Sequence, residues 1–175
     1  MPLEPGDWVM QNAANSGVGV ALVAVARTRG VRTVNVVRRE SAAEQLRALG
    51  GDVVVVDGPK LRDRVHAAVR EAGGDPERIR LGADAVAGRA TGQLLRCLAP
   101  GATLVNYGGL SGEPAQMDAR DLIFLETVVR GFWLVRWFQH ASRAEQARVM
   151  GEVARLVADG TLRVPVAATY PLAEV

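Results

Sequence analysis

The stretch from Asp7 to Arg39 constrains the fold most, because its hydrophobic pattern changes period twice within one short segment. It reads DWVMQNAANSGVGVALVAVARTRGVRTVNVVRR. A short apolar run at 8–10 leads into a polar, glycine-bearing turn at 12–19. An apolar helix-like segment follows from Val20 to about Arg29, and a β-rich run follows at 33–37. Strand, glycine turn, helix and strand in this order predict a βαβ unit of the dinucleotide-binding kind, with a right-handed crossover.

The glycine turn matches the dinucleotide fingerprint only in part. Laid over G-x-G-x-x-G, the turn runs from Ala14 to Gly19, and only Gly19 falls on a glycine position. The context supports a phosphate site, because a helix N-terminus offers free N–H groups to a pyrophosphate and glycine lets the backbone come close. The alternative is a turn of small residues that packs closely and binds nothing.

Two arginines end the second predicted strand, roughly twenty residues after the turn, where the residue that reads the ribose belongs. An acid at this place holds a free 2′-hydroxyl, whereas an arginine accommodates a 2′-phosphate. Opposite charges about 4 Å apart near a surface interact by roughly 4 kcal/mol before desolvation. Arg38 therefore predicts NADPH rather than NADH, and Glu40 lies past the strand end. A solvated basic loop is the alternative.

The rest of the chain repeats the alternation of strand and helix. Further β-prone runs lie at 52–57, 79–86, 102–107 and 127–134, and helical segments lie at 41–49, 60–72, 91–98, 118–124 and 142–158. Ser41 and Ser142 begin segments with capping-box spacing, and Asp118 is expected near an N-cap. The run at 52–57 is continuously apolar, as in a strand covered on both faces. The segment 161–175 is β-prone.

This pattern predicts one α/β domain over residues 1–175. We expect a Rossmann fold with a doubly wound, mostly parallel six-stranded sheet and helices on both faces. The last strand, 127–134, would lie at a sheet edge, where an exposed apolar edge favours pairing of two copies into a homodimer.

Composition narrows the classes of function. The chain has 175 residues, 49% of them hydrophobic, and a net charge of +2, so nucleic acid is not an expected partner. Cys97 is the single cysteine, which excludes an internal disulfide and fits a reducing compartment. No apolar run approaches the roughly 18 residues that span a bilayer, so no membrane association is expected. A cytoplasmic location is expected, and a mitochondrial one stays open because a transit peptide would precede this sequence.

Four segments together resemble one enzyme family. They read GDWVMQNAANSGVG at the glycine turn, NVVRR at the second strand, LVNYGGLSG at 104–112 and RGFWL at 130–134. The chain resembles the trans-2-enoyl thioester reductases of the mitochondrial type, within the medium-chain dehydrogenase/reductase superfamily. The resemblance is collinear over nearly the whole chain, and NSGVG together with FWL is specific to that branch.

The resemblance implies an NADPH-dependent enzyme that reduces the 2,3-double bond of an enoyl-CoA or enoyl-ACP, and a homodimer formed through this domain. The cofactor contacts that it implies are Asn15, Ser16, Gly17, Val18 and Gly19 at the phosphates, Arg38, Arg39 and Glu40 around the 2′-phosphate, and Tyr107, Gly108, Gly109, Leu110, Phe132, Trp133 and Leu134 along the nicotinamide half.

The resemblance also implies that the family's catalytic tyrosine lies in an N-terminal domain absent from this chain, and that the full enzyme continues beyond residue 175. We therefore expect no catalytic residue here, and we expect the isolated chain to bind NADPH with negligible turnover. Tyr107 has a hydroxyl that could donate a proton, but its implied role is cofactor contact. His66 and His140 are far apart and are interpreted as surface histidines, so no metal site is expected.

Three other interpretations stay open. A quinone or alkenal reductase of the same superfamily shares the scaffold, and a non-catalytic NADPH-binding module would share the glycine turn. An S-adenosylmethionine methyltransferase also pairs a glycine turn with a strand-end residue, but it requires an acid for the ribose hydroxyls, and Arg38 argues against it.

Overall fold

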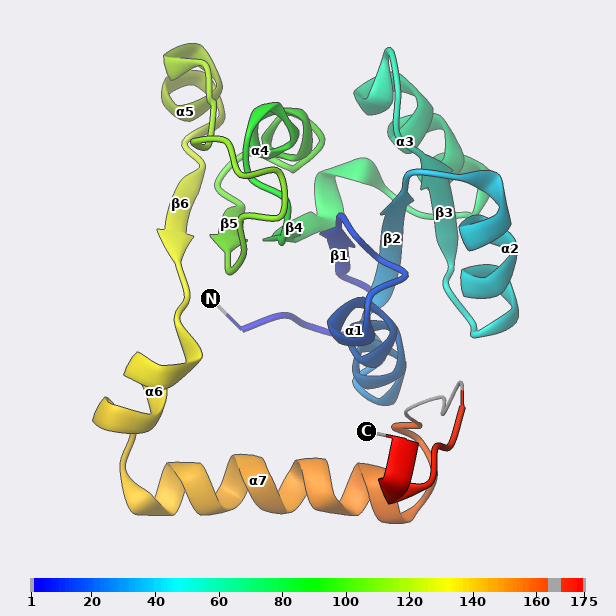
Figure 1. Ribbon diagram of the computed structural model, residues 1–175. Helices are drawn as coiled ribbons and strands as arrows, with labels where there is room; N and C mark the ends of the chain where they lie inside the picture. Colours follow the sequence, from blue (N-terminus) through cyan, green and yellow to red (C-terminus); the bar gives the residue numbers. More distant parts are fainter. Residues whose placement is uncertain (1, 164–167, 175) are drawn as a thin grey trace. The chain divides into compact units, whose positions relative to one another are not determined.

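The structure is a computed structural model that describes residues 2–163 and 168–174 (Figure 1). The chain divides into two compact units, residues 1–141 and residues 142–175. The first unit holds all six strands of the sheet.

The first unit is built on one six-stranded sheet. Its strands are β1 (Trp8–Gln11), β2 (Arg32–Val37), β3 (Val53–Val56), β4 (Ile79–Asp84), β5 (Thr103–Asn106) and β6 (Val128–Gly131). Their order is β3-β2-β1-β4-β5-β6, and every neighbouring pair is parallel. The predicted doubly wound α/β fold is thereby confirmed. The strand order reverses between β1 and β4, the switch point outside which such sheets bind ligands.

Helices cover both faces of the sheet. The helices of this unit are α1 (Gly17–Thr28), α2 (Glu40–Ala48), α3 (Leu61–Glu71), α4 (Arg89–Leu95), α5 (Ala119–Leu125) and α6 (Leu134–His140), with a 3₁₀ turn η1 (Pro76–Arg78). Helices α1 to α4 cover the sheet, whereas α6 buries no residue. On one face, α3 and α4 pack Val65 and Leu94 against Met10. On the other face, α1 and α2 (Figure 1) bury Val23 and Leu46 in one second cluster.

The edge strand β3 confirms the expectation of cover on both faces. Val53 and Val55 are buried in the cluster that includes α3, whereas Val54 and Val56 are partly buried against the cluster that includes α2. The second pair keeps some exposure because β3 has a neighbour on one side only.

Two of the three predicted helix starts are confirmed. Asp118 caps α5 by accepting from the Arg120 N–H at 2.9 Å, and Ser142 Oγ accepts from the Glu145 N–H at 3.1 Å. The third is wrong, because α2 begins at Glu40 with Arg39 at its cap, and Ser41 lies inside the first turn. The Ala43 N–H already bonds to the Arg39 carbonyl, so the helix starts before the capping box can form.

The predicted strand at 127–134 is too long. The strand β6 ends at Gly131, opposite Asn106, where its partner β5 also ends. The Phe132 N–H makes one more bond to the Asn106 carbonyl at 2.8 Å, after which the chain turns into α6. Phe132 and Trp133 therefore follow the strand, and Leu134 is the first residue of a helix that the sequence pattern did not predict.

The second unit consists mainly of α7 (Arg143–Ala158). The helix ends at Ala158 with Asp159 at its C-cap, and the Leu162 N–H bonds back to the Leu156 carbonyl at 2.8 Å. The described residues of the β-prone segment 161–175 form no strand, and 172–174 form a 3₁₀ turn, η2. Residues 164–167 and 175 of that prediction lie outside the described residues. No helix in the described part of the chain is long and apolar enough to cross a membrane.

Candidate functional site

The turn between β1 and α1 depends on Gly19. Ser16 Oγ accepts from the Gly19 N–H at 3.1 Å and caps the helix. A Cβ added to Gly19 would lie 2.3 Å from the Ala14 carbonyl oxygen, which no real side chain tolerates. Gln11 reaches under the same turn and donates from Nε2 to the Gly19 carbonyl at 2.9 Å. Gly19 is therefore the glycine that lets the helix start pack against the turn, the role of the last fingerprint glycine.

The first turn of α1 has free donors. In the part of the chain that the structure describes, the N–H groups of Gly17 and Val18 donate to no protein acceptor, and no acidic residue lies in the first turn. A Cβ added to Gly17 would meet no atom within 4 Å, so the fold itself does not require this glycine. Free N–H groups at the positive end of a twelve-residue helix fit the phosphates of a dinucleotide.

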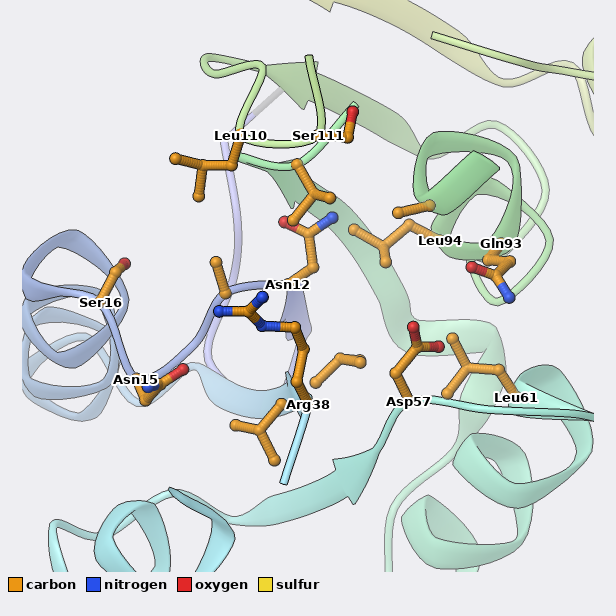
Figure 2. Close-up of a pocket in the computed structure, with 15 residues that line it drawn as sticks. Asn12, Asn15, Ser16, Arg38, Asp57, Leu61, Gln93, Leu94, Leu110 and Ser111 are labelled. Carbon is orange, nitrogen blue, oxygen red and sulfur yellow. The ribbon is translucent and has the colours of Figure 1, made fainter. Parts of the chain in front are cut away.

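A cleft of about 480 Å³ opens at the carboxyl edge of the sheet (Figure 2). It is bounded by the β1–α1 turn, the ends of β2 and β3, the segment after β4, α4 and the loop after β5. Its lining residues are Asn12, Ala13, Asn15, Ser16, Val36, Val37, Arg38, Asp57, Leu61, Val86, Ala90, Gln93, Leu94, Leu110 and Ser111. The cleft thus brings together Asn15, Ser16, Arg38 and Leu110 from the predicted site.

The charged side chains of this cleft come from two strand ends. Arg38 follows β2 and extends toward the middle of the cleft, and Asp57 follows β3 (Figure 2). Asp57 Oδ1 accepts from the Gly58 N–H at 2.8 Å. The other two residues predicted around a 2′-phosphate lie outside the lining, since Arg39 caps α2 and Glu40 Oε1 pairs with Arg47 at 2.8 Å.

A second hollow, of about 590 Å³, lies around the loop after β5 and the end of β6. Its lining residues are Ala87, Asn106, Tyr107, Gly108, Gly109, Ala115, Gly131, Phe132, Trp133 and Arg136. Five residues predicted along the nicotinamide half therefore share one hollow. Leu134 lines neither of the two hollows.

Tyr107 carries a neutral phenol at this second hollow. Its hydroxyl oxygen is buried and has no hydrogen-bond partner among the described residues. Burial, and secondarily the negative charge of Asp84, raise the pKa of Tyr107. The hydroxyl therefore keeps its proton at neutral pH.

The sequence reasoning missed Asp84, the last residue of β4. The side chain is fully buried and its carboxylate accepts five hydrogen bonds. Oδ1 accepts from Asn12 Nδ2 at 2.7 Å and from the N–H groups of Val86 and Ala87 at 2.9 and 3.1 Å. Oδ2 accepts from Thr91 Oγ1 at 2.6 Å and from Asn106 Nδ2 at 3.0 Å. The available signal was an acid at the end of an apolar strand.

These hydrogen bonds decide the charge of Asp84. Burial by itself would raise the pKa of its carboxyl, but the donors, with Thr91 and Asn12 the strongest, outweigh burial and hold the pKa below its ordinary value. A buried carboxylate is thus kept ionised by neutral donors at the edge of both hollows.

The described residues offer no metal site. No group of three or more His, Cys, Asp or Glu side chains among them is placed to hold an ion. His66 is buried, and its Nε2 lies 3.0 Å from the Cys97 carbonyl, so the interpretation of His66 as a surface residue was wrong. Helix α3 turns this position toward α4, which the helical spacing of apolar residues did not reveal. Burial raises the pKa of the Cys97 thiol to about 12, which makes it a poor ligand.

The fold and the glycine turn define a Rossmann-type domain of the medium-chain dehydrogenase/reductase class. The family described as zinc-binding dehydrogenase matches residues 17–154, and the chain belongs to this family. In spite of the family's name, the described residues do not fit a zinc ion.

Known proteins place the chain more closely. It is 37% identical over 160 residues to the mitochondrial enoyl-[acyl-carrier-protein] reductase of Dictyostelium discoideum, an alignment that covers 89% of this chain and 44% of that protein. The human mitochondrial enoyl-[acyl-carrier-protein] reductase is 34% identical over 174 residues, covering 97% of this chain and 46% of that protein. The chain spans about half the length of the curated relatives it matches.

Solved structures share the fold. The Etr1p/NADP/crotonyl-CoA complex superposes with a TM-score of 0.85 at 19% identity, over 96% of this chain and 48% of that one. The Escherichia coli quinone oxidoreductase complexed with NADPH is similar with a TM-score of 0.78 at 23% identity, over 94% of this chain and 49% of that one. At these identities the likeness concerns the fold alone.

Proposed function

We propose that this chain is the cofactor-binding part of an NADPH-dependent reductase that acts on the 2,3-double bond of enoyl thioesters. The observation that carries the cofactor is the cleft, which Ser16 and Arg38 line together. The free N–H groups of Gly17 and Val18 follow Ser16 directly in the chain, although these two residues do not line the cleft themselves. The substrate class is supported by the relatives named as enoyl-[acyl-carrier-protein] reductases, which are 37% and 34% identical to this chain.

Different residues would contact different parts of the bound cofactor. The N–H groups at the start of α1 would hold the pyrophosphate, and Arg38 would hold the 2′-phosphate. The loop at 107–109 and the aromatic pair Phe132 and Trp133 would form the wall of the nicotinamide half and exclude water. The bound cofactor supplies a hydride for the β-carbon of the substrate, and the protein positions the reacting groups.

Arg38 gives the test of this proposal. Calorimetric titration at one salt concentration should show tighter binding of NADPH than of NADH. Arg38→Asp should abolish the preference and lower the affinity for NADPH by about 100-fold, because it replaces attraction to the 2′-phosphate by repulsion. Arg47→Gln, on α2 outside the cleft lining, is the matched control. Equal binding of both nucleotides by the unmodified chain would contradict the proposal.

A second candidate is a quinone or alkenal reductase of the same superfamily, because the Escherichia coli quinone oxidoreductase has the same fold as this chain. A full-length protein containing this chain decides between the two. NADPH oxidation with crotonyl-CoA and none with a benzoquinone supports the enoyl reductase, and the reverse supports the quinone reductase. Tight NADPH binding without turnover of either would identify a non-catalytic NADPH-binding module.

The same proposal includes a homodimer. In the described sheet β6 pairs only with β5, and the side chain of Val128 on β6 is 53% exposed. Helix α5, which precedes this strand, exposes Ile123 and Phe124, the latter by 76%. An apolar strand edge beside an apolar helix is suited to a two-fold interface. Light scattering after size exclusion should give a dimer that Phe124→Glu converts to a monomer, whereas a monomeric wild type would contradict it.

The compartment belongs to the same proposal. The relatives are named as mitochondrial proteins, and the buried thiol of Cys97 is suited to a reducing compartment. We propose the cytoplasm or the mitochondrial matrix as the place of action. Fluorescent tagging of the full-length protein in its own cell tests this proposal. Fluorescence found outside the cell would contradict it.

A further inference from the structure

The two hollows share a wall, and that wall is the segment that follows β4. Val86 lines the cleft and Ala87 lines the second hollow. Both backbone N–H groups bond to the same oxygen of Asp84, at 2.9 and 3.1 Å. Ala87 is held with φ at +62°, a conformation that L-residues rarely adopt, so the turn needs external support. The carboxylate provides that support from inside the protein.

The loop after β5 is fixed to the same segment. The N–H groups of Tyr107, Leu110 and Ser111 bond to the carbonyls of Asp84, Ala85 and Val86, respectively, at 2.9, 3.1 and 2.9 Å. A Cβ on Gly108 would lie 2.7 Å from the Ala85 carbonyl oxygen, so loop and segment are in direct backbone contact.

Asp84 also reaches the loop through a side chain. Asn106 Nδ2 donates both to Asp84 Oδ2 at 3.0 Å and to the Gly108 carbonyl at 3.1 Å. On the other side, Asn12 donates to Asp84 Oδ1 and lines the cleft beside the glycine turn. One carboxylate thus links the end of β1, the segment after β4 and the loop after β5.

We propose that Asp84 is a positioning residue that fixes the loop after β5, on the nicotinamide side, relative to the glycine turn. Both halves of one extended dinucleotide can then bind to the site at the same time. The inference rests on the proposed NADPH function. Fixed hydrogen bonds around binding groups raise affinity because the site need not be ordered when the ligand arrives.

The adenine side of the cleft is independent of this network. None of the five hydrogen bonds that the Asp84 carboxylate accepts comes from Arg38, Asp57 or Leu61, which line the cleft at β2, β3 and α3. Loss of Asp84 should therefore weaken NADP⁺, which spans both sides, but not 2′,5′-ADP, which carries only the adenosine part with its two phosphates. General loosening of the fold would weaken both ligands alike.

The variants separate the arms of the network. Asp84→Ala removes all five acceptor contacts, and we expect a loss of NADP⁺ affinity of about tenfold or more. Asp84→Asn keeps an acceptor for Asn12 and the two N–H groups, but its amide nitrogen would face Asn106 Nδ2, so we expect a loss of about threefold. Asn106→Ala removes only the arm to Gly108 and should behave like Asp84→Asn. All three should leave 2′,5′-ADP affinity unchanged.

Asp7 supplies the matched control. It is a buried acid at the opposite end of the sheet, so Asp7→Asn should lower stability without changing the affinity for either ligand. The experiment is calorimetric titration of each folded variant with NADP⁺ and with 2′,5′-ADP.

Each outcome decides the inference. A split between the two ligands, with partial rescue in Asp84→Asn relative to Asp84→Ala, supports it. Unchanged NADP⁺ affinity in folded Asp84→Ala, or equal losses for both ligands, overturns it. If Asp84→Ala does not fold, Asp84→Asn and Asn106→Ala carry the same decision. If the wild type binds neither ligand, the proposed function fails, and the inference fails with it.

Discussion

The two ends of the parallel sheet each bury an aspartate, and they stabilise its negative charge in different ways. At the amino end, burial would raise the pKa of Asp7, but the Glu4 N–H and the Arg78 guanidinium lower it, with Arg78 Nη2 at 2.9 Å from Oδ1. At the carboxyl end, Asp84 is held by amides, a hydroxyl and backbone N–H groups. The carboxylate of Asp7 is therefore paired with a full cation, whereas the carboxylate of Asp84 is stabilised by neutral dipoles.

This difference assigns a structural role to the amino end of the sheet and a ligand-binding role to the carboxyl end. At the amino end a hollow of about 470 Å³ is lined by Asp7 and Arg78 themselves, so the cation there is already paired. The core at this end is closely packed, since a Cβ on Gly74 would overlap the Trp8 ring and Arg32 lies over that ring at 4.1 Å. The carboxyl end keeps its cation available, because Arg38 has no hydrogen bond or ion pair within the described chain. Satisfying Asp84 with neutral groups leaves Arg38 available for an anionic ligand.

The largest expected effect lies at the amino end. Trp8 is 1% exposed and packs in the main core, so Trp8→Ala should lower the free energy of unfolding by about 3–5 kcal/mol. The NADPH affinity of the folded variant should stay unchanged, because Trp8 lines neither hollow. Denaturant titration and calorimetry measure the two quantities. A clear loss of affinity in the folded variant would break the separation between the two ends.

The next effect sharpens the comparison within the carboxyl end. Gly19→Ala should destabilise the protein by about 1–3 kcal/mol, because its Cβ would collide with the Ala14 backbone. Gly17→Ala should change stability by less than about 1 kcal/mol, since no protein atom lies within 4 Å of its Cβ. It should weaken NADPH by about tenfold, because a methyl group would stand where phosphate approaches the helix. Unchanged NADPH binding in Gly17→Ala would contradict the proposed phosphate site.

The smallest expected effect is a change in how the free energy of unfolding depends on pH and on salt. Both acids have a folded pKa below their ordinary value of 3.8, so their stabilisation is complete above that pH and is lost as pH falls through the folded pKa. Asp7→Asn and Asp84→Asn should each flatten the fall in stability below about pH 4. Salt at 1 M should reduce the contribution of Asp7, whose partner Arg78 is half-exposed, and spare that of Asp84. Equal salt sensitivity would contradict the assignment of neutral partners to Asp84.

The alternation of strands and helices was predictable because it depends on local period. The apolar runs at 8–10, 33–37 and 102–107 each became a strand of the parallel sheet, and Asp118 and Ser142 capped the predicted helices. Prediction was wrong where a partner decided the outcome. The last strand ended at Gly131 because its partner β5 ends there, and His66 was buried because Cys97, just after α4, lies against it.

By itself, the sequence determined the order of strand, glycine turn, helix and strand, the positive charge after β2 and the resemblance to one reductase family. Each of these depends on residues that are close neighbours in the chain. Tertiary structure alone decided that Asn12, Thr91 and Asn106 would meet on Asp84, up to 72 positions away. Only the register of β1, β4 and β5 brings these strand ends together, and no local pattern encodes that register.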